Sequence, residues 1–136
     1  MFIIFVIIGL VMDMKDCVFC NIINGDIPCK KVYEDEFLLA LLDINPFMPG
    51  HTLIIPKEHT LDYDTIDEDI LVKIVKLAKK LSPNIVDAMN ADGYTLVQNN
   101  GNVQEVKHFH LHIIPKYNNK PDISVDEAYK KITECK

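Results

Sequence analysis

The chain has 136 residues, of which 49% are hydrophobic and 25% are charged, and its formal net charge is −6. This length predicts one domain with a substantial core. The negative charge argues against a nucleic-acid or anionic-membrane binder, because such proteins carry a basic face. It remains compatible with a small anionic ligand held by histidines and backbone amides. The four cysteines are too few and too unevenly spaced for a disulfide scaffold.

The chain opens with an almost wholly apolar run at residues 1–12. The run is too short for a membrane span, which needs about 20 apolar residues. It also lacks the basic start and the cleavage site of a signal peptide. We therefore expect residues 1–13 to be an extension created by an upstream start-codon assignment, residues 14–136 to form a single domain, and no stable membrane insertion. A weak membrane-associating segment is the alternative.

The first half of the domain is expected to contain a short helix and three strands. Residues 17–25 have the pattern of a helical turn. Strands are expected at residues 31–34, 37–44 and 51–56, and the second is apolar enough to be buried on both faces. The intervening segment 45–50, Asn-Pro-Phe-Met-Pro-Gly, is a turn-rich loop.

A longer helix is expected where apolar residues between 70 and 81 follow helical spacing, with Asp67 or Asp69 as its cap. Ser82-Pro83 is expected to interrupt this helix. The interruption is either a kink or the start of a second short helix through Met89.

Two further strands, at residues 94–98 and about 105–115, precede a terminal helix that a capping box at 124–127 opens. Sequential strands with short turns predict an antiparallel sheet with helices packed on it. The fold class is therefore α+β: an antiparallel meander sheet with one long helix and short terminal helices.

The segment from His108 to His112 places three of the five histidines on alternate positions. Alternation is the period of a β-strand, so the imidazoles are expected on one face and the apolar side chains on the other. Neighbouring imidazoles then start about 6–7 Å apart at their Cα atoms. Two of them can converge on one phosphate or one metal ion, and we interpret the segment as a functional site.

Two kinds of site compete for these histidines. Cys17-x-x-Cys20 offers two thiolates, and histidines from His51, His59 and the strand would complete a tetrahedral zinc site. A redox role for the two cysteines is disfavoured, because the expected strand-then-helix context is missing. Alternatively, a neutral imidazole is a nucleophile at phosphorus, and a protonated neighbour stabilises the developing charge or protonates the leaving group. Amides of residues 99–104 would then bind phosphate oxygens.

The alternating segment, His-Phe-His-Leu-His-Ile-Ile-Pro, resembles the signature of the histidine triad (HIT) nucleotide hydrolases and transferases. The likeness extends in the same order over residues 14–117 and is greatest to the Hint-like branch, in its zinc-containing bacterial and archaeal type. Its other segments are Phe19–Pro28, Leu42–Pro46, Pro49–His59, Gly93-Tyr94 and Asn99–Gly101.

This resemblance implies a cytoplasmic, homodimeric enzyme that binds a purine nucleotide and cleaves at its α-phosphate. Substrates would be adenosine phosphoramidates, aminoacyl adenylates or dinucleoside polyphosphates. It makes His110 the nucleophile that becomes nucleotidylated, His112 a phosphate contact that assists charge and proton transfer, and His51 a support for the histidine network. Zinc would be structural, with no cofactor needed for the chemical step. Its ligands would be Cys17, Cys20, His59 and His108.

The resemblance also implies which residues bind the substrate. Asp43 would accept hydrogen bonds from the ribose hydroxyls, and Asn99 and Gln104 would bind the phosphate. The base pocket would be lined by Phe19, Ile22, Leu41 and Ile44, for each of which ordinary core packing is the alternative. The sequence departs from the family pattern at residues 101–104, a segment about two residues shorter that lacks a second glycine.

Three functions follow from these residues. The first is an enzyme that works through a His110 adduct, and the second is a nucleotide-binding protein with little or no turnover. The third is a purely structural zinc domain. The third fits worst, because one tetrahedral zinc cannot use both Cys17 and Cys20 together with all five histidines.

Overall fold

A computed structural model describes residues 16–134, so the expectations for residues 1–13 lie outside the described part. Within it, no helix is long and apolar enough to cross a membrane. The elements are α1 (Val18–Ile23), β1 (Lys31–Glu34), β2 (Leu38–Leu42), β3 (Thr52–Pro56), α2 (Glu68–Met89), β4 (Gly93–Val97), the 3-10 turn η3 (Gly101–Val103), β5 (Leu111–Lys116) and α3 (Val125–Glu134).

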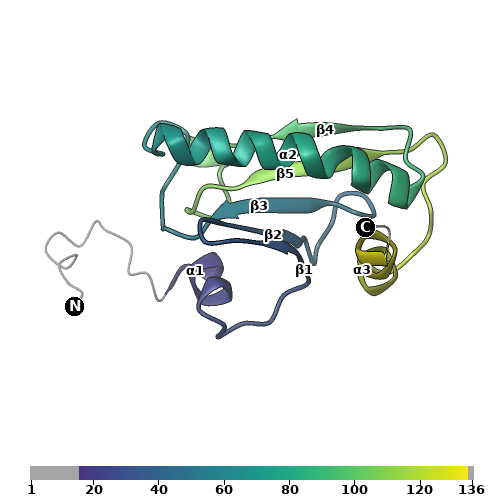
Figure 1. Cartoon of the computed structure of the whole chain (residues 1–136), viewed down its shortest axis with the longest axis horizontal. Helices are drawn as coiled ribbons and strands as arrows, with labels where there is room; N and C mark the ends of the chain where they lie inside the picture. The colour runs from purple at the N-terminus through teal and green to yellow at the C-terminus, as the bar shows by residue number, and fades with distance from the viewer. Residues whose placement is uncertain (1–15, 135–136) are drawn as a thin grey trace, which may run out of the picture.

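The strands form one antiparallel sheet in the order β1-β2-β3-β5-β4 (Figure 1), which confirms the α+β class. The first three strands form a meander. Helix α2 then carries the chain to the far edge, and β5 returns between β3 and β4. This return places His112 directly opposite Leu53 of β3, so His112 lies inside the sheet and not at its edge.

The sheet separates two apolar layers, with α2 and α3 on one face and α1 on the other (Figure 1). Strand β2 contributes to both. Leu38, Ala40 and Leu42 pack toward α2, whereas Leu39 and Leu41 pack toward α1. The predicted burial of this strand on both faces is confirmed. Helix α1 therefore covers the sheet face opposite the long helix α2, and a site formed by α1 lies on that face.

Helix α2 begins at the predicted cap, since the side chain of Asp67 accepts hydrogen bonds from two backbone N–H groups of the first turn. It continues through Pro83 as one element, so, of the two alternatives for Ser82-Pro83, that of a separate second helix is wrong. Residues beyond the proline, such as Ile85, pack in the same core as those before it. The buried Ser82 hydroxyl donates to the Ala78 carbonyl at 2.7 Å. This packing outweighs the backbone hydrogen bond that proline removes.

Strand β5 begins at Leu111, so the prediction of a strand from about residue 105 is wrong for its first half. Residues 105–108 form a bend. The reason is the partner of Phe109, whose N–H donates to the carbonyl of Thr60, in a loop, at 2.7 Å. The alternation of faces nevertheless holds, because Phe109 and Ile113 are buried in the α2 core.

The terminal helix α3 begins with the predicted capping box. Ser124 Oγ accepts from the Glu127 N–H at 3.1 Å, and the Glu127 carboxylate accepts from the Ser124 N–H at 3.0 Å. The two orphan donors at this helix end are therefore satisfied reciprocally.

Candidate active site and metal centre

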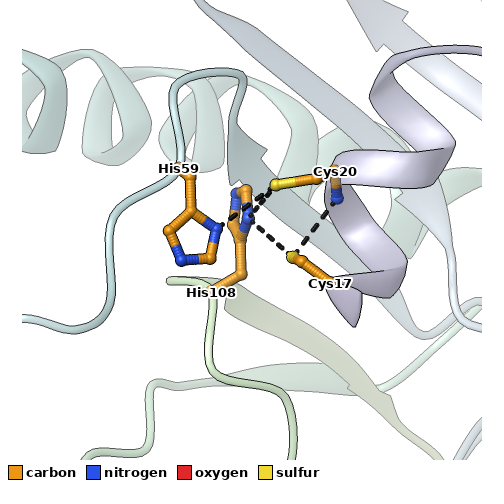
Figure 2. A group of neighbouring side chains, drawn as sticks. All are labelled: Cys17, Cys20, His59 and His108. Carbon is orange, nitrogen blue, oxygen red and sulfur yellow. Dashed lines mark hydrogen bonds between the residues drawn. The ribbon is translucent and has the colours of Figure 1, made fainter. Parts of the chain in front are cut away.

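Four side chains from three separate segments converge on the α1 face of the sheet (Figure 2). Cys17 caps α1 and Cys20 lies in its first turn, His59 follows β3, and His108 precedes β5. Their ligand atoms all lie within 4.8 Å of one another. The four residues that the sequence predicted as one metal site are thus brought together, and we call them the metal cluster.

The hydrogen bonding of His108 directs one ring nitrogen into this cluster. Its Nε2 lies 2.8 Å from the carbonyl of Pro56, to which it donates. The proton therefore sits on Nε2, and the lone pair of Nδ1 faces Cys17 Sγ at 3.3 Å and Cys20 Sγ at 3.6 Å. A carbonyl that fixes the tautomer in this way is typical of metal-binding histidines.

The electrostatics of the cluster favour a bound cation. Burial lowers the pKa of His108 to about 4, so its imidazole is neutral at pH 7 and able to act as a ligand. Burial, followed by the neighbouring Cys17, raises the pKa of the Cys20 thiol to about 12. A thiolate here needs a positive charge beside it. Two cysteines and two histidines are the donors of many tetrahedral zinc sites.

A second histidine group lies beside the metal cluster, and its protons are fixed by a chain of hydrogen bonds. The Phe47 N–H donates to His51 Nδ1 at 3.1 Å, so neutral His51 carries its proton on Nε2. His51 Nε2 lies 2.8 Å from His112 Nδ1, and its N–H donates to that nitrogen. Neutral His112 is left with its own proton on Nε2. His112 is therefore a hydrogen-bond donor at its far nitrogen.

His110 has the opposite tautomer. Its Nδ1 donates to the carbonyl of His108 at 2.8 Å, so Nε2 holds a free lone pair. The His110 ring meets His112 edge to face at 4.8 Å between centroids, and Phe19 at 5.1 Å. The two imidazoles therefore offer one nucleophilic nitrogen and one N–H donor side by side, which is the combination that chemistry at a phosphate requires.

All three histidines of this group are held neutral. Burial lowers the pKa of His51 and His110, and it lowers that of His112 to about 4, helped by the two neighbouring histidines. The negative charge of Asp43 opposes the shift at each of them. A neutral His110 is a nucleophile without prior deprotonation at pH 7.

A cavity of about 500 Å³ opens beside this pair, and both His110 and His112 line it. The volume is typical of a small-molecule site. Its walls are mainly apolar and come from α1, β2 and the loop after β2. Five further residues predicted to bind substrate line it: Phe19, Ile22, Leu41, Asp43 and Ile44.

Asp43 is the carboxylate best held within this cavity. Its Oδ1 accepts from the Asn45 N–H at 2.8 Å, and its Oδ2 lies 3.7 Å from His51 Nε2. Fixed on one side, the carboxylate retains acceptor capacity toward a ligand.

Asn99 and Gln104 are not among the residues that line this cavity. Gln104 is buried, and its amide donates to the Leu61 carbonyl at 2.6 Å. The Asn99 carbonyl accepts from the side chain of Gln98 at 2.9 Å. Their predicted contact with phosphate stays a prediction.

The cavity also has walls that sequence reasoning missed. Ile27, Pro28 and Cys29 line it from the connection between α1 and β1, a stretch without regular periodicity. Glu105 lines it as well. Simple alternation assigns Glu105 to the face of Phe109, away from the histidines, and the bend at residues 105–108 removes that assignment.

Comparison with known proteins agrees with this geometry. The family model described as HIT domain matches residues 24–119. An uncharacterized HIT-like protein of Methanocaldococcus jannaschii is 45% identical over 127 residues, which cover 85% of this chain and 98% of that protein. The adenosine 5'-monophosphoramidase hnt1 of Schizosaccharomyces pombe is 41% identical over 111 residues, covering 80% of each chain.

A solved structure with the same fold is described as a Zn-bound histidine triad family protein from Mycobacterium smegmatis. It is 33% identical with a TM-score of 0.83, and the match covers 90% of this chain and 94% of that one.

Proposed function

The chain belongs to the HIT family, and from that premise we propose that it cleaves nucleotide derivatives at the α-phosphate through a covalent adduct on His110. The observation that carries this proposal is the pairing of opposite tautomers: a free Nε2 lone pair on His110 beside an N–H on His112 Nε2, both lining the cavity. The name of the fission yeast relative supports an adenosine phosphoramidate as the substrate.

In the proposed complex the base lies against the apolar wall that includes Phe19 and Ile22, and the ribose hydroxyls donate to Asp43. His110 Nε2 attacks phosphorus. The bond to the leaving group breaks, its electron pair stays with that group, and the group takes a proton from water. His112 Nε2–H donates to a phosphate oxygen, where negative charge grows in the transition state.

Water completes the cycle. Its oxygen forms a bond to the phosphorus of the adduct, the bond between phosphorus and His110 Nε2 breaks, and that electron pair returns to the imidazole. One water proton is released to solvent, and the nucleoside monophosphate leaves. His51 acts throughout by holding His112 in the tautomer that donates.

We also propose that zinc occupies the metal cluster. The donor set fits, and the histidine tautomer and raised thiol pKa described above both favour a cation. When bound, zinc supplies a crosslink between α1, the loop after β3 and the segment before β5. The Zn-bound relative supports this assignment. Because the cluster uses His108, the metal leaves His110 and His112 free for the reaction.

We also propose that two copies of the chain form a homodimer through strand β4 and helix α2. Strand β4 is a sheet edge, and its Tyr94 and Leu96 are 43% and 49% exposed. On α2, Val72 and Val75 are 51% and 55% exposed. Apolar side chains on an open edge favour pairing with a second copy. Light scattering on the native protein and on Leu96→Lys tests this: the native protein has the mass of a dimer and the variant that of a monomer.

One observation favours the alternative of a binding protein with little turnover. In the shortened segment before the histidines, the Gln104 amide donates to the Leu61 carbonyl, and Gln104 does not line the cavity. A phosphate donor that assists turnover would then be missing.

Hydrolysis of adenosine 5'-phosphoramidate by the full chain, beside its His110→Ala variant, tests the proposal. We expect release of AMP by the native protein only, and a covalent AMP on the peptide that contains His110 when the reaction is quenched. Retained AMP binding in the variant excludes a folding defect. If the native protein binds AMP but releases none from the substrate, the binding protein is the correct function.

A further inference from the structure

The charges that line the cavity are unusual for a nucleotide site. The lining contains two carboxylates, those of Asp43 and Glu105, and, among residues 16–134, neither a lysine nor an arginine. The three neighbouring histidines are neutral by themselves. A phosphate bound here meets hydrogen-bond donors but no permanent positive side chain of this chain. Every further negative charge on the substrate is therefore uncompensated.

The two carboxylates differ in their surroundings. Asp43 is held by the Asn45 N–H and faces His51. Glu105 is exposed, and its carboxylate has no hydrogen-bond or ion-pair partner in the described part of the chain. Its charge nevertheless reaches the reacting group, because it favours the protonated form of His110 and so opposes the fall in that pKa. Glu105 is thus a free negative charge near the nucleophile.

We propose that Glu105 determines specificity by favouring substrates whose leaving group carries positive charge, such as an amine with a second, distant ammonium group. This inference rests on the function proposed above. In that function Asp43 binds the ribose, and the histidines bind the α-phosphate. The leaving group is therefore the part of the substrate that is left to interact with Glu105. Screening in physiological salt acts over about 8 Å, so two charges inside one cavity still interact.

The reaction itself is unchanged by this selection. His110 Nε2 forms the bond to phosphorus, the P–N bond breaks, and its electron pair goes to the departing amine nitrogen, which takes a proton from water. The distant ammonium keeps its proton and takes no part in bond making. A polyphosphate leaving group instead brings negative charges toward Glu105, which disfavours it.

Two lysines near the site could also influence which leaving group the enzyme prefers, through their positive charge. Lys107 Nζ is engaged, since it donates to the Gly101 carbonyl at 2.9 Å. Lys120 lines a smaller neighbouring cavity of about 160 Å³, which shares Asp43 and His51 with the site. Lys120 would favour negative leaving groups, so the experiment must separate its effect from that of Glu105.

Three adenosine phosphoramidates with the same P–N linkage provide the test. Their amines are butylamine, 1,3-diaminopropane and β-alanine, which leave a neutral, a positive and a negative end. We expect kcat/KM of the native protein to fall by about 5–10-fold at each step from positive to neutral to negative. We call these differences in kcat/KM among the three substrates the spread. In Glu105→Gln the ratio of kcat/KM between successive substrates should fall by about 5–10-fold, so that the spread shrinks. The exposed carboxylate of Glu36, outside this cavity, gives the control: Glu36→Gln keeps the native spread.

Affinity for AMP gives a second readout that needs no turnover. Glu105→Gln should bind AMP about 5–10-fold more tightly than the native protein, because a charge that repels phosphate is removed. Equal rates for the three substrates, or a spread that Glu105→Gln leaves intact, overturn this inference and leave the proposed function standing. A spread that changes only in Lys120→Gln overturns it as well. If no AMP forms from any of the three, the proposed function fails and the inference with it.

Discussion

His108 and His110 are two residues apart, yet the proposed function gives them different roles, and the difference lies in which nitrogen each ring donates to a carbonyl. His108 donates from Nε2 to Pro56, which leaves Nδ1 facing two thiols. His110 donates from Nδ1 to His108, which leaves Nε2 free. The choice of carbonyl partner, more than the residue type, therefore separates the metal cluster from the reacting pair.

The two regions also depend on the fold in different ways. The metal cluster joins three segments that are distant in sequence, so a metal bound there would contribute to stability as a crosslink. The reacting pair relies on a hydrogen-bond relay that starts at the Phe47 N–H and ends at His112. Damage to the first should appear as unfolding, and damage to the second as lost turnover in a folded protein.

Removal of a metal ligand should have the largest effect. We expect Cys20→Ser to lose the bound zinc and more than about 3 kcal/mol of stability, because a structural metal contributes directly to folding. Elemental analysis and urea unfolding measure both quantities. Cys29→Ser is the matched control, since Cys29 lies outside the cluster. A Cys20→Ser protein as stable as Cys29→Ser would contradict the structural role of the metal.

Protonation of His112 in acid should lower the stability of the folded protein by a smaller amount. The pKa of His112 is about 4 in the folded protein and about 6.5 in the unfolded chain, which therefore binds the proton first as the pH falls. Stability is full above pH 6.5 and is lost between pH 6.5 and 4. At pH 4.5 we expect this residue to account for about 2–3 kcal/mol of the loss.

Urea unfolding of the native protein and of His112→Asn, at pH 7.5 and at pH 4.5, measures that contribution. The variant should lose less stability between the two values than the native protein does. An equal loss in both proteins would mean that His112 is not held neutral by its surroundings.

The relay itself is tested at His51 by a pair of substitutions. His51→Leu removes the donor to His112 Nδ1 and should lower kcat about 10–100-fold, because His112 is no longer held in the donating tautomer. His51→Gln places an amide N–H near the position of the lost donor and should recover most of the rate. Affinity for AMP should change little in either variant. If Gln is as slow as Leu, the imidazole acts through packing and not through this hydrogen bond.

Much of the site could be predicted from sequence because its signals are local. Alternation of His108, His110 and His112 with apolar residues places the imidazoles on one face whether or not the backbone is a regular strand. The spacing of Cys17 and Cys20 similarly predicts two ligands from one helical turn. The α+β class follows from the same short-range patterns, since each strand and helix has its own period.

What could not be predicted depends on contacts between distant segments. The late start of β5 results from the hydrogen bond of Phe109 to Thr60, in a loop 49 positions earlier by number. The continuity of α2 through Pro83 results from core packing on both sides of the proline. Glu105 was missed for the same reason, because the bend that brings it to the cavity breaks the alternation on which the prediction relied.

The smallest expected effect concerns Gln104, which resemblance assigns to the substrate and whose amide bonds the Leu61 carbonyl at 2.6 Å. If that bond is its role, Gln104→Ala should cost about 1 kcal/mol of stability, because the Leu61 carbonyl loses its partner, and should leave AMP affinity unchanged. Gln98→Ala is the matched control, since its hydrogen bonds are local and half-buried or exposed. A tenfold loss of AMP affinity in Gln104→Ala alone would instead support the assignment to the phosphate. It would also mean that the segment at residues 101–104 rearranges when a nucleotide binds, which joins this segment to the reacting pair as one functional unit.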